Sequence, residues 1–200
     1  MILYMIRHGE SEANAGGYHS GWGCVHLTEK GRQQAAETGK MVKNLKIDEL
    51  YVSDVLRAQE TAEIIFPDME RAFMPMAREI NTTPLFGKNK AQLTALYGEK
   101  YLKCREKFNY APLGIDCESF MHVSMRAGQL LRWAETQGDK RICVVSHAGF
   151  IKAVVARVLG IEPSVSVFSC DNASLSAFEF SGGTWKVKKW NITPMDQGNV

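Results

Sequence analysis

Short apolar runs alternate with segments of helical periodicity along this chain. Residues 2–6 form a fully apolar run, which is typical of a strand that is buried on both faces. Residues 28–44 instead repeat small and apolar side chains at helical spacing, and they predict a helix that begins at Thr28. The residues expected on its inner face are Ala35, Ala36, Gly39 and Val42 or Lys43.

The alternation continues to the end of the chain. We expect strands at 49–53 and 141–146, helices at 56–65, 119–136 and 150–159, and a third apolar segment around 72–77. Between two final β-like segments, Ser181-Gly182-Gly183 indicates a hairpin turn. Residues 81–118 mix aromatic with basic side chains, and we expect one helix there.

Strands that alternate with helices predict a largely parallel sheet with helices on both faces. The fold class is therefore α/β, a three-layer α/β/α sandwich with a mostly parallel central sheet and an antiparallel element at its edge. No repeat, low-complexity tract or linker divides the chain, so we expect one domain over residues 1–200. Within it, residues 81–118 are expected to form a lid that selects the substrate.

Composition excludes several classes of protein. The 200 residues carry 24 Lys+Arg against 22 Asp+Glu, a net charge of +2, and 45% are hydrophobic. These values disfavour disorder, a coiled coil and a disulfide mini-protein. The balanced charge also argues against a nucleic-acid partner, although it leaves room for a small positive pocket.

The five cysteines are scattered and never form a C-x-x-C pair, which fits a reducing compartment. No apolar stretch approaches the ~20 residues of a membrane span. We therefore expect a cytoplasmic protein without a membrane partner. The oligomeric state stays open, with a homodimer among the options.

Chemistry-bearing residues follow the predicted strands. Arg7-His8 follows the first strand, Arg57 the second, Glu79 the third apolar segment and His147 the strand at 141–146. Ligands of open α/β sheets bind beyond the carboxyl ends of the parallel strands. We therefore expect these side chains to converge at one edge of the sheet.

Such a set suits phosphoryl transfer without a metal. Arg7 and Arg57 each present a rigid fork of donors to phosphate oxygens. A neutral His8 ring nitrogen can attack phosphorus while its other nitrogen donates to a fixed acceptor. His147 adds donors, and Glu79 can protonate the leaving oxygen. Glu10 is the alternative acid.

Several motifs together resemble the histidine phosphatase superfamily, also called the phosphoglycerate-mutase-like family. The resemblance covers nearly the whole chain except residues 81–118. The motifs that carry it are Arg7-His8-Gly9-Glu10-Ser11 with Asn14, Leu27 to Ala35, Ser53 to Ala62, Val144-Val145-Ser146-His147 and Asn172-Ala173-Ser174.

The resemblance implies a phosphomonoester hydrolase with a phosphohistidine on His8, no cofactor and no metal. Its partners would be a small phosphomonoester as substrate and inorganic phosphate as product. Glu79 would act as general acid and then as base. The resemblance also assigns Asn14, Ser11 and the backbone amide of Ala148 to phosphate or substrate binding.

The chain departs from the family pattern after Glu79, where many phosphatases carry Gly-x-Trp-Glu-Gly and this chain has Asn81 to Asn89. Cys117 precedes Glu118-Ser119 where glycine is usual, and Ala148 stands where glycine is more frequent. These departures leave the substrate open. The chain is without the added length of the cofactor-dependent mutases, which favours hydrolysis.

Two alternative functions stay open, a phosphoglycerate-mutase-type isomerase and a silent module that binds a phospho-ligand or a partner. As a hypothesis, the lid residues Lys88, Lys90, Tyr97 or Tyr101 select the substrate. His19, Cys24 and His26 lie close in sequence, but their spacing matches no standard zinc pattern, so we interpret them as loop residues.

Overall fold

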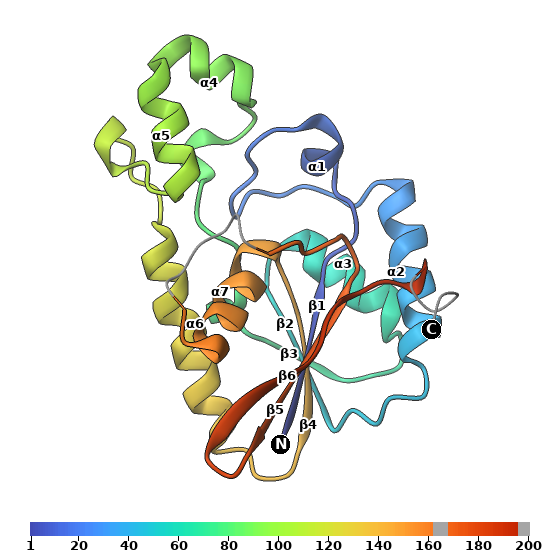
Figure 1. The fold of residues 1–200 in the computed structure, drawn as a ribbon. Helices are drawn as coiled ribbons and strands as arrows, with labels where there is room; N and C mark the ends of the chain where they lie inside the picture. Colours follow the sequence, from blue (N-terminus) through green and yellow to red (C-terminus); the bar gives the residue numbers. More distant parts are fainter. Residues whose placement is uncertain (162–167, 196–200) are drawn as a thin grey trace.

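A computed structural model describes residues 1–161 and 168–195 and shows an α/β fold (Figure 1). Its strands are β1 (Ile2–Arg7), β2 (Glu49–Val52), β3 (Arg71–Phe73), β4 (Arg141–Ser146), β5 (Leu175–Ser181) and β6 (Thr184–Ile192). In the described residues they form one six-stranded sheet with the order β3-β2-β4-β1-β5-β6. The first four strands in that order are parallel to one another. Strand β5 pairs antiparallel with β1, and β6 pairs antiparallel with β5. The predicted fold class is confirmed.

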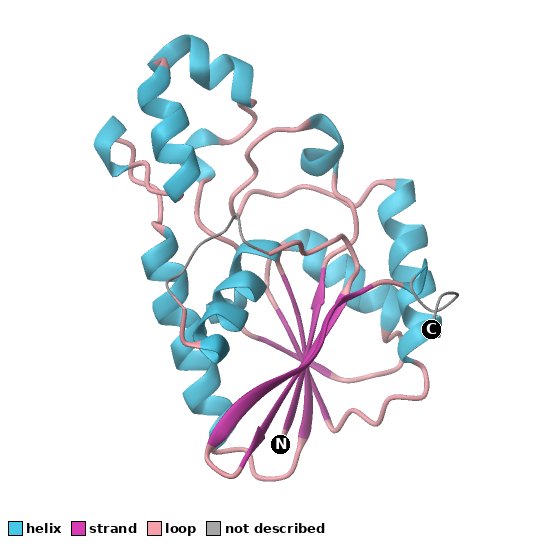
Figure 2. Ribbon diagram, in the orientation of Figure 1, coloured by secondary structure: helices cyan, strands magenta, loops and turns pink. Residues whose placement is uncertain are grey.

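Helices cover both faces of the sheet, as Figure 2 shows in cyan on either side of the magenta strands. The longer helices are α2 (Glu29–Val42), α3 (Leu56–Ile65), α6 (Phe120–Glu135) and α7 (Ala148–Leu159), and α1 (Glu12–Gly16) is a short one. Helices α2 and α3 pack together on one face, and α6 and α7 on the other. The apolar run of β1 therefore serves two cores. Leu3 and Met5 belong to the core under α6 and α7, and Ile6 to the core under α2 and α3.

The helix ends follow from local chemistry. Thr28 is the N-cap of α2 and its hydroxyl accepts the Gly31 amide at 3.0 Å. On the inner face of α2 the structure corrects one expectation, because Ala36 is exposed and Thr38 is buried. The Thr38 hydroxyl donates to the Ala173 carbonyl at 2.8 Å, which satisfies this polar group inside the core.

The third apolar segment is only partly a strand. After β3 the chain turns into a 3-10 helix, η1 (Pro75–Ala77), because Pro75 cannot donate a backbone hydrogen bond to a sheet. Glu79 therefore follows η1 and not the strand itself. This turn carries the chain from the edge strand β3 back over the end of the sheet, and the Ser146 hydroxyl donates to the Ala77 carbonyl there.

The expectation of one helix in residues 81–118 is wrong. The segment holds the helices α4 (Lys90–Tyr97) and α5 (Glu99–Lys107) and the 3-10 turns η2 (Thr83–Leu85) and η3 (Ala111–Leu113). Gly98 separates α4 from α5 with φ of 59°. The two helices stand apart from the layers around the sheet (Figure 1) and have a small apolar cluster of their own, which includes Leu93, Tyr101 and Tyr110.

The hairpin predicted near the end of the chain is present. β5 and β6 are joined at Gly182 and Gly183, whose φ angles of 58° and 75° suit a tight hairpin turn. In residues 1–161 and 168–195, no helix is both long enough and apolar enough to span a membrane.

Candidate active site

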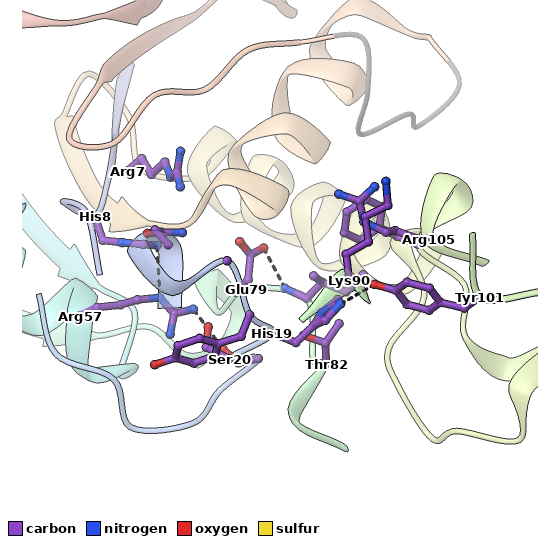
Figure 3. A pocket seen from close by; sticks show the side chains of 16 residues that line it. Arg7, His8, His19, Ser20, Arg57, Glu79, Thr82, Lys90, Tyr101 and Arg105 are labelled. Atoms are coloured by element: carbon purple, nitrogen blue, oxygen red, sulfur yellow. Dashed lines mark hydrogen bonds between the residues drawn. The ribbon is translucent and has the colours of Figure 1, made fainter. Parts of the chain in front are cut away.

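A cavity of about 360 Å³ opens at the carboxyl ends of the parallel strands. Its wall has three parts (Figure 3). Arg7, His8, Arg57 and Glu79 lie near the ends of the strands, residues between 14 and 21 at the end of α1 and in the loop after it lie beside them, and the 81–118 segment contributes side chains from α4 and α5. We call the region of the first group the sheet end, and the region of α4, α5 and the neighbouring His19 the distal end of the cavity.

His8 lies at the bottom of the sheet end and is only 3% exposed. Its Nδ1 lies 2.7 Å from the Gly9 carbonyl oxygen, and its Nε2 lies 3.2 Å from the Nε of Arg57. Since a carbonyl only accepts and a guanidinium only donates, Nδ1 carries the proton and Nε2 presents its lone pair. Burial, then the charges of Arg57 and Arg7, lower the pKa of His8 well below 6.5. His8 is therefore a neutral imidazole with a free nucleophilic nitrogen.

Arg57 lies in the first turn of α3 and is 2% exposed. Its Nη2 donates to the Gly21 carbonyl at 3.0 Å, and its Nη1 has no hydrogen-bond partner among the described residues. Burial lowers the pKa of Arg57 to about 10, with Glu79 opposing and Arg7 adding to the effect. Arg57 thus stays charged at neutral pH, although it is enclosed by protein.

Arg7 ends β1 and supplies the second guanidinium. Its Nη1 donates to the Cys170 carbonyl at 2.5 Å, while its buried Nε lacks a partner in the described part of the chain. His147 precedes α7 and is fully buried, with its ring centre 5.1 Å from that of His8. Its Nε2 lies 2.8 Å from the Ser53 hydroxyl, and no described residue bonds its Nδ1.

Three residues that neighbour His8 thus each have a buried polar atom without a partner among the described residues, namely Arg7 Nε, Arg57 Nη1 and His147 Nδ1. Leaving a buried donor unpaired costs about 1–3 kcal/mol, and more when the group is charged. Burial, then Arg57, His8, Arg7 and Arg126, lowers the pKa of His147 well below 6.5. Two unpaired guanidinium nitrogens close to a neutral His8 favour an anion in this part of the cavity.

Glu79 faces His8 from the opposite wall (Figure 3). Its Oε1 accepts the Ile80 amide at 2.9 Å, and its Oε2 accepts the Gly149 amide at 3.3 Å. A Cβ atom on Gly149 would lie 2.3 Å from Oε1, so only glycine leaves room for this carboxylate. The alternative acid, Glu10, is bound by Lys30 at 2.8 Å and Thr28 at 3.0 Å on the side of α2 and does not line the cavity.

The predicted phosphate- or substrate-binding residues Asn14, Ser11 and Ala148 differ in their relation to the cavity. Asn14 lines the cavity, and its Oδ1 accepts from the Ser11 backbone amide and hydroxyl and from Asn172. Ser11 is the buried N-cap of α1 and positions Asn14. Ala148 does not line this cavity. It borders a second cavity of about 260 Å³ on the far side of Arg7 and Glu79.

At the distal end, Lys90 and Tyr101 line the cavity but Lys88 and Tyr97 do not. Lys88 lies before the N-cap of α4 and is exposed, and Tyr97 ends α4 with 39% of its surface exposed. Lys88 is therefore outside the helix, and Tyr97 lies at its other end, about two turns along from Lys90. Arg105, four residues after Tyr101 on α5, lines the cavity and was missed, although this spacing could have indicated it.

His19 was interpreted as a loop residue, and it also lines the cavity. Its Nε2 lies 3.1 Å from the Tyr101 hydroxyl, and burial, then the charge of Arg105, lowers its pKa to about 4. No sequence signal marked this contact. Lys90 and Arg105 form no ion pair within the part of the chain that the structure describes. The distal end therefore carries two exposed cations and a neutral imidazole.

A metal site is not apparent in the described ranges, where no three or more His, Cys, Asp or Glu side chains are grouped to hold an ion. His26 pairs with Glu60 at 2.7 Å and His19 contacts Tyr101, while Cys24 is exposed. The three residues His19, Cys24 and His26 therefore do not form a common site.

Comparison with known proteins adds a family and its members. The profile of the "Histidine phosphatase superfamily (branch 1)" matches residues 3–193. Phosphoglycerate mutase 1 of Saccharomyces cerevisiae is 37% identical over 125 residues, with 58% of this chain and 51% of that protein covered. The chain thus spans about half the length of the mutases that it matches.

Two further relatives match almost end to end. Adenosylcobalamin/alpha-ribazole phosphatase of Salmonella typhimurium is 27% identical over 197 residues and covers 96% of either chain. The crystal structure of phosphoserine phosphatase from Entamoeba histolytica, in complex with 3-phosphoglyceric acid, is 29% identical with a TM-score of 0.81. It covers 96% of this chain and 97% of that one.

Proposed function

This chain belongs to the histidine phosphatase superfamily, and we propose from that premise that it hydrolyses small phosphomonoesters through a phosphohistidine on His8. The observation that carries the proposal is that three residues neighbouring His8 each hold a buried polar atom without a described partner, namely Arg7 Nε, Arg57 Nη1 and His147 Nδ1. Charged donors of this kind suit the three equatorial oxygens of a transferring phosphoryl group.

In the first step the Nε2 lone pair of His8 attacks phosphorus. The N–P bond forms as the bond from phosphorus to the ester oxygen breaks, and Glu79, protonated beforehand, gives its proton to the leaving oxygen. Arg57 Nε, which donates to Nε2, transfers its hydrogen bond to a phosphate oxygen. The product of this step is an alcohol, and Glu79 is left as a carboxylate.

In the second step water releases the phosphate. Glu79 takes a proton from the water as its oxygen attacks phosphorus, the N–P bond breaks and the Nε2 lone pair is restored. Inorganic phosphate leaves, and Glu79 is protonated again. The hydrogen bond from Nδ1 to the Gly9 carbonyl holds the same tautomer through both steps.

The distal end supports a substrate whose leaving group carries a second anionic group. Lys90 and Arg105 offer two positive charges there, on the 81–118 segment that we interpret as a lid. Related proteins are named for phosphoserine and phosphoglycerate, which each carry a carboxylate beside the phosphate. We propose that the 81–118 segment selects substrates of this kind.

A mutase is the second candidate, because the 37% identity to a phosphoglycerate mutase exceeds that to the phosphatases. Hydrolysis is favoured since the phosphatases match over 96% of their length and the mutase over 51%. Incubation with 3-phosphoglycerate distinguishes the two, because a phosphatase yields free phosphate and a mutase yields 2-phosphoglycerate. Tight phosphate binding without turnover of any ester would instead favour a silent binding module.

Trapping the intermediate tests the mechanism. The protein is incubated with a ³²P-labelled ester and the reaction is quenched rapidly without acid. The labelled protein should carry a phosphate that is acid-labile and base-stable. The variant His8→Ala should give no label and lose activity by at least about 10⁴-fold. A control with EDTA should leave the rate unchanged. Acid-stable label, full activity of His8→Ala or a reversible loss with EDTA would each contradict the proposal.

A further inference from the structure

Arg126 on α6 makes an unusual set of contacts for a residue outside the cavity. Its Nη1 donates to the carbonyls of Met76 at 2.5 Å and Arg78 at 2.9 Å, and its Nη2 donates to the carbonyl of Glu79 at 3.3 Å. The guanidinium thus follows the backbone of the segment that leads from η1 to Glu79. It lies 5.4 Å from the ring centre of Phe150, which closes its other side.

These carbonyls have lost the partners that a strand would give them. After β3 the chain leaves the sheet, and buried carbonyls need hydrogen bonds from elsewhere. Arg126 supplies them from a single rigid fork, which fixes three carbonyls relative to one another. The Trp22 indole nitrogen adds a second donor to the Glu79 carbonyl, at 2.7 Å.

Glu118 completes the arrangement. Both of its carboxylate oxygens accept from Arg126, at 2.8 Å from Nε and 2.7 Å from Nη2. The same carboxylate accepts the Asn81 amide at 3.0 Å, and the Glu118 amide donates to the Asn81 carbonyl at 2.9 Å. The two side chains of the pair are only 18% and 13% exposed, so solvent weakens the interaction little. The Arg126–Glu118 pair therefore holds the chain on both sides of Glu79.

We propose that Arg126, paired with Glu118, is the positioning residue for the general acid Glu79. The inference rests on the proposed function, in which Glu79 protonates the leaving oxygen. Arg126 bonds the backbone of Glu79 and not its carboxylate, which is held by the amides of Ile80 and Gly149. Loss of Arg126 should therefore impair proton transfer and leave the phosphate-binding atoms around His8 in place.

The test compares two esters that differ in their need for an acid. An alkyl phosphate such as phosphoserine releases an alkoxide that must be protonated, whereas 2,4-dinitrophenyl phosphate releases an anion that is stable at neutral pH. We would measure kcat/KM for both, because this ratio reports the steps up to phosphoryl transfer onto His8. Glu79→Gln gives the loss expected when the acid is absent, about 10²–10⁴-fold on the alkyl ester.

For Arg126→Met we expect a loss of about 10²-fold on the alkyl phosphate and less than about threefold on the dinitrophenyl ester. Adding Arg126→Met to Glu79→Gln should cost little more than Glu79→Gln alone, because both changes remove the same proton transfer. Arg126→Lys should restore little, since an ammonium cannot span three carbonyls. Glu118→Gln should show the same selectivity for the alkyl ester with a smaller loss.

Arg157→Met is the matched control, because Arg157 bonds Ser124 on α6 from α7 and contacts neither Glu79 nor its segment. It should not change the ratio between the two esters. Thermal melts identify variants that fail to fold, and in that case Glu118→Gln carries the test.

Equal losses on the two esters, no loss on either, or losses that multiply in the double variant would each overturn the inference. Failure of the proposed function looks different. The wild type would then turn over neither ester, or His8→Ala would retain activity, whatever the result for Arg126.

Discussion

The two ends of the cavity are built differently. At the sheet end, His8 and Arg57 are at most 3% exposed and His147 beside them is fully buried, and the three residues come after β1, β2 and β4 of the central sheet. At the distal end, Lys90 and Arg105 are exposed, and both belong to a segment whose apolar cluster is separate from the cores on either face of the sheet. Substitutions at the two ends should therefore change different kinetic constants. The sheet end should govern kcat, and the distal end should govern KM for particular esters.

The largest effect should come from the sheet end. Arg57→Met keeps the aliphatic stem but removes the donor to His8 Nε2 and the unpartnered Nη1. We expect kcat to fall by about 10²–10³-fold for every ester, as on removal of one transition-state donor. Steady-state kinetics on an ester panel measures this. Arg71→Met, on β3 and paired with Glu63, is the control, and a loss confined to anionic esters would contradict the division between the ends.

A second change acts on Glu79 from a residue that does not line the cavity. Gly149→Ala would bring a Cβ atom to 2.3 Å from Glu79 Oε1 and displace the carboxylate without removing it. We expect kcat for alkyl phosphates to fall by about 10–100-fold, since a misplacement near 1 Å is costly. Gly39→Ala is the control, because its Cβ meets only ordinary contacts at 3.4 Å or more. Unchanged rates for Gly149→Ala would argue against Glu79 as the acid.

A smaller effect is expected at the distal end. The double variant Lys90→Ala, Arg105→Ala should raise KM for 3-phosphoglycerate by about tenfold, as two partly solvated charged contacts are lost. KM for p-nitrophenyl phosphate should stay the same, because this ester carries no second anion. Lys88→Ala, outside the cavity, should change neither value. Equal changes for both esters would show that the distal end does not read the leaving group.

The last effect concerns stability and not rate, and it depends on pH. The folded-state pKa values of His8 and His147 lie well below 6.5, and that of His19 is about 4. Below pH 6.5 the unfolded chain therefore binds more protons than the folded chain. The free energy of unfolding should fall as the pH is lowered from 6.5 towards 4, by up to about 1.4 kcal/mol per pH unit for each such histidine.

Chemical denaturation between pH 4.5 and 6.5 measures this slope. Hydrogen bonding with Arg78 lowers the pKa of Asp54. For Glu60, burial raises the pKa, but the Leu27 amide, His26 and Arg32 together lower it by more. Both carboxyl groups therefore act mainly below this window. His19→Asn should make the slope shallower, because it removes a group whose folded-state pKa is about 4. An identical slope in His19→Asn and wild type would mean that the distal end contributes nothing to it.

The difference between the ends also explains what the sequence could predict. Arg7, His8, Arg57 and His147 directly follow or flank buried segments whose periodicity is strong, so the strand-end rule brings them together. Glu79 was placed by the same rule after the third apolar segment, and the resemblance supported its role, but the turn that carries it was not predicted. Its path through η1 depends on Pro75 and on Arg126, which is far away in sequence.

The distal end could not be predicted in the same way. Helices α4 and α5 are short. Asn89 and Gly98 mark the two ends of α4, but such signals locate only the ends of a helix. The positions of His19 and Arg105 depend on how α5 docks on the loop before Trp22, which the contact between His19 and Tyr101 records. Local periodicity does not report such docking, and this is why Lys88 and Tyr97 were assigned and His19 was missed. Only Arg105 could have been added, from its spacing to Tyr101.

The paired hydrogen bonds between Asn81 and Glu118 have a consequence for how such enzymes diversify. The chain leaves the body of the protein and returns to it at one point, so the span that an inserted segment must bridge is nearly zero. Loop-closure entropy grows only slowly with length, by about 0.6 kcal/mol for each doubling. Insertions of quite different length and sequence could thus be exchanged at this junction during evolution while the reacting groups stay where they are.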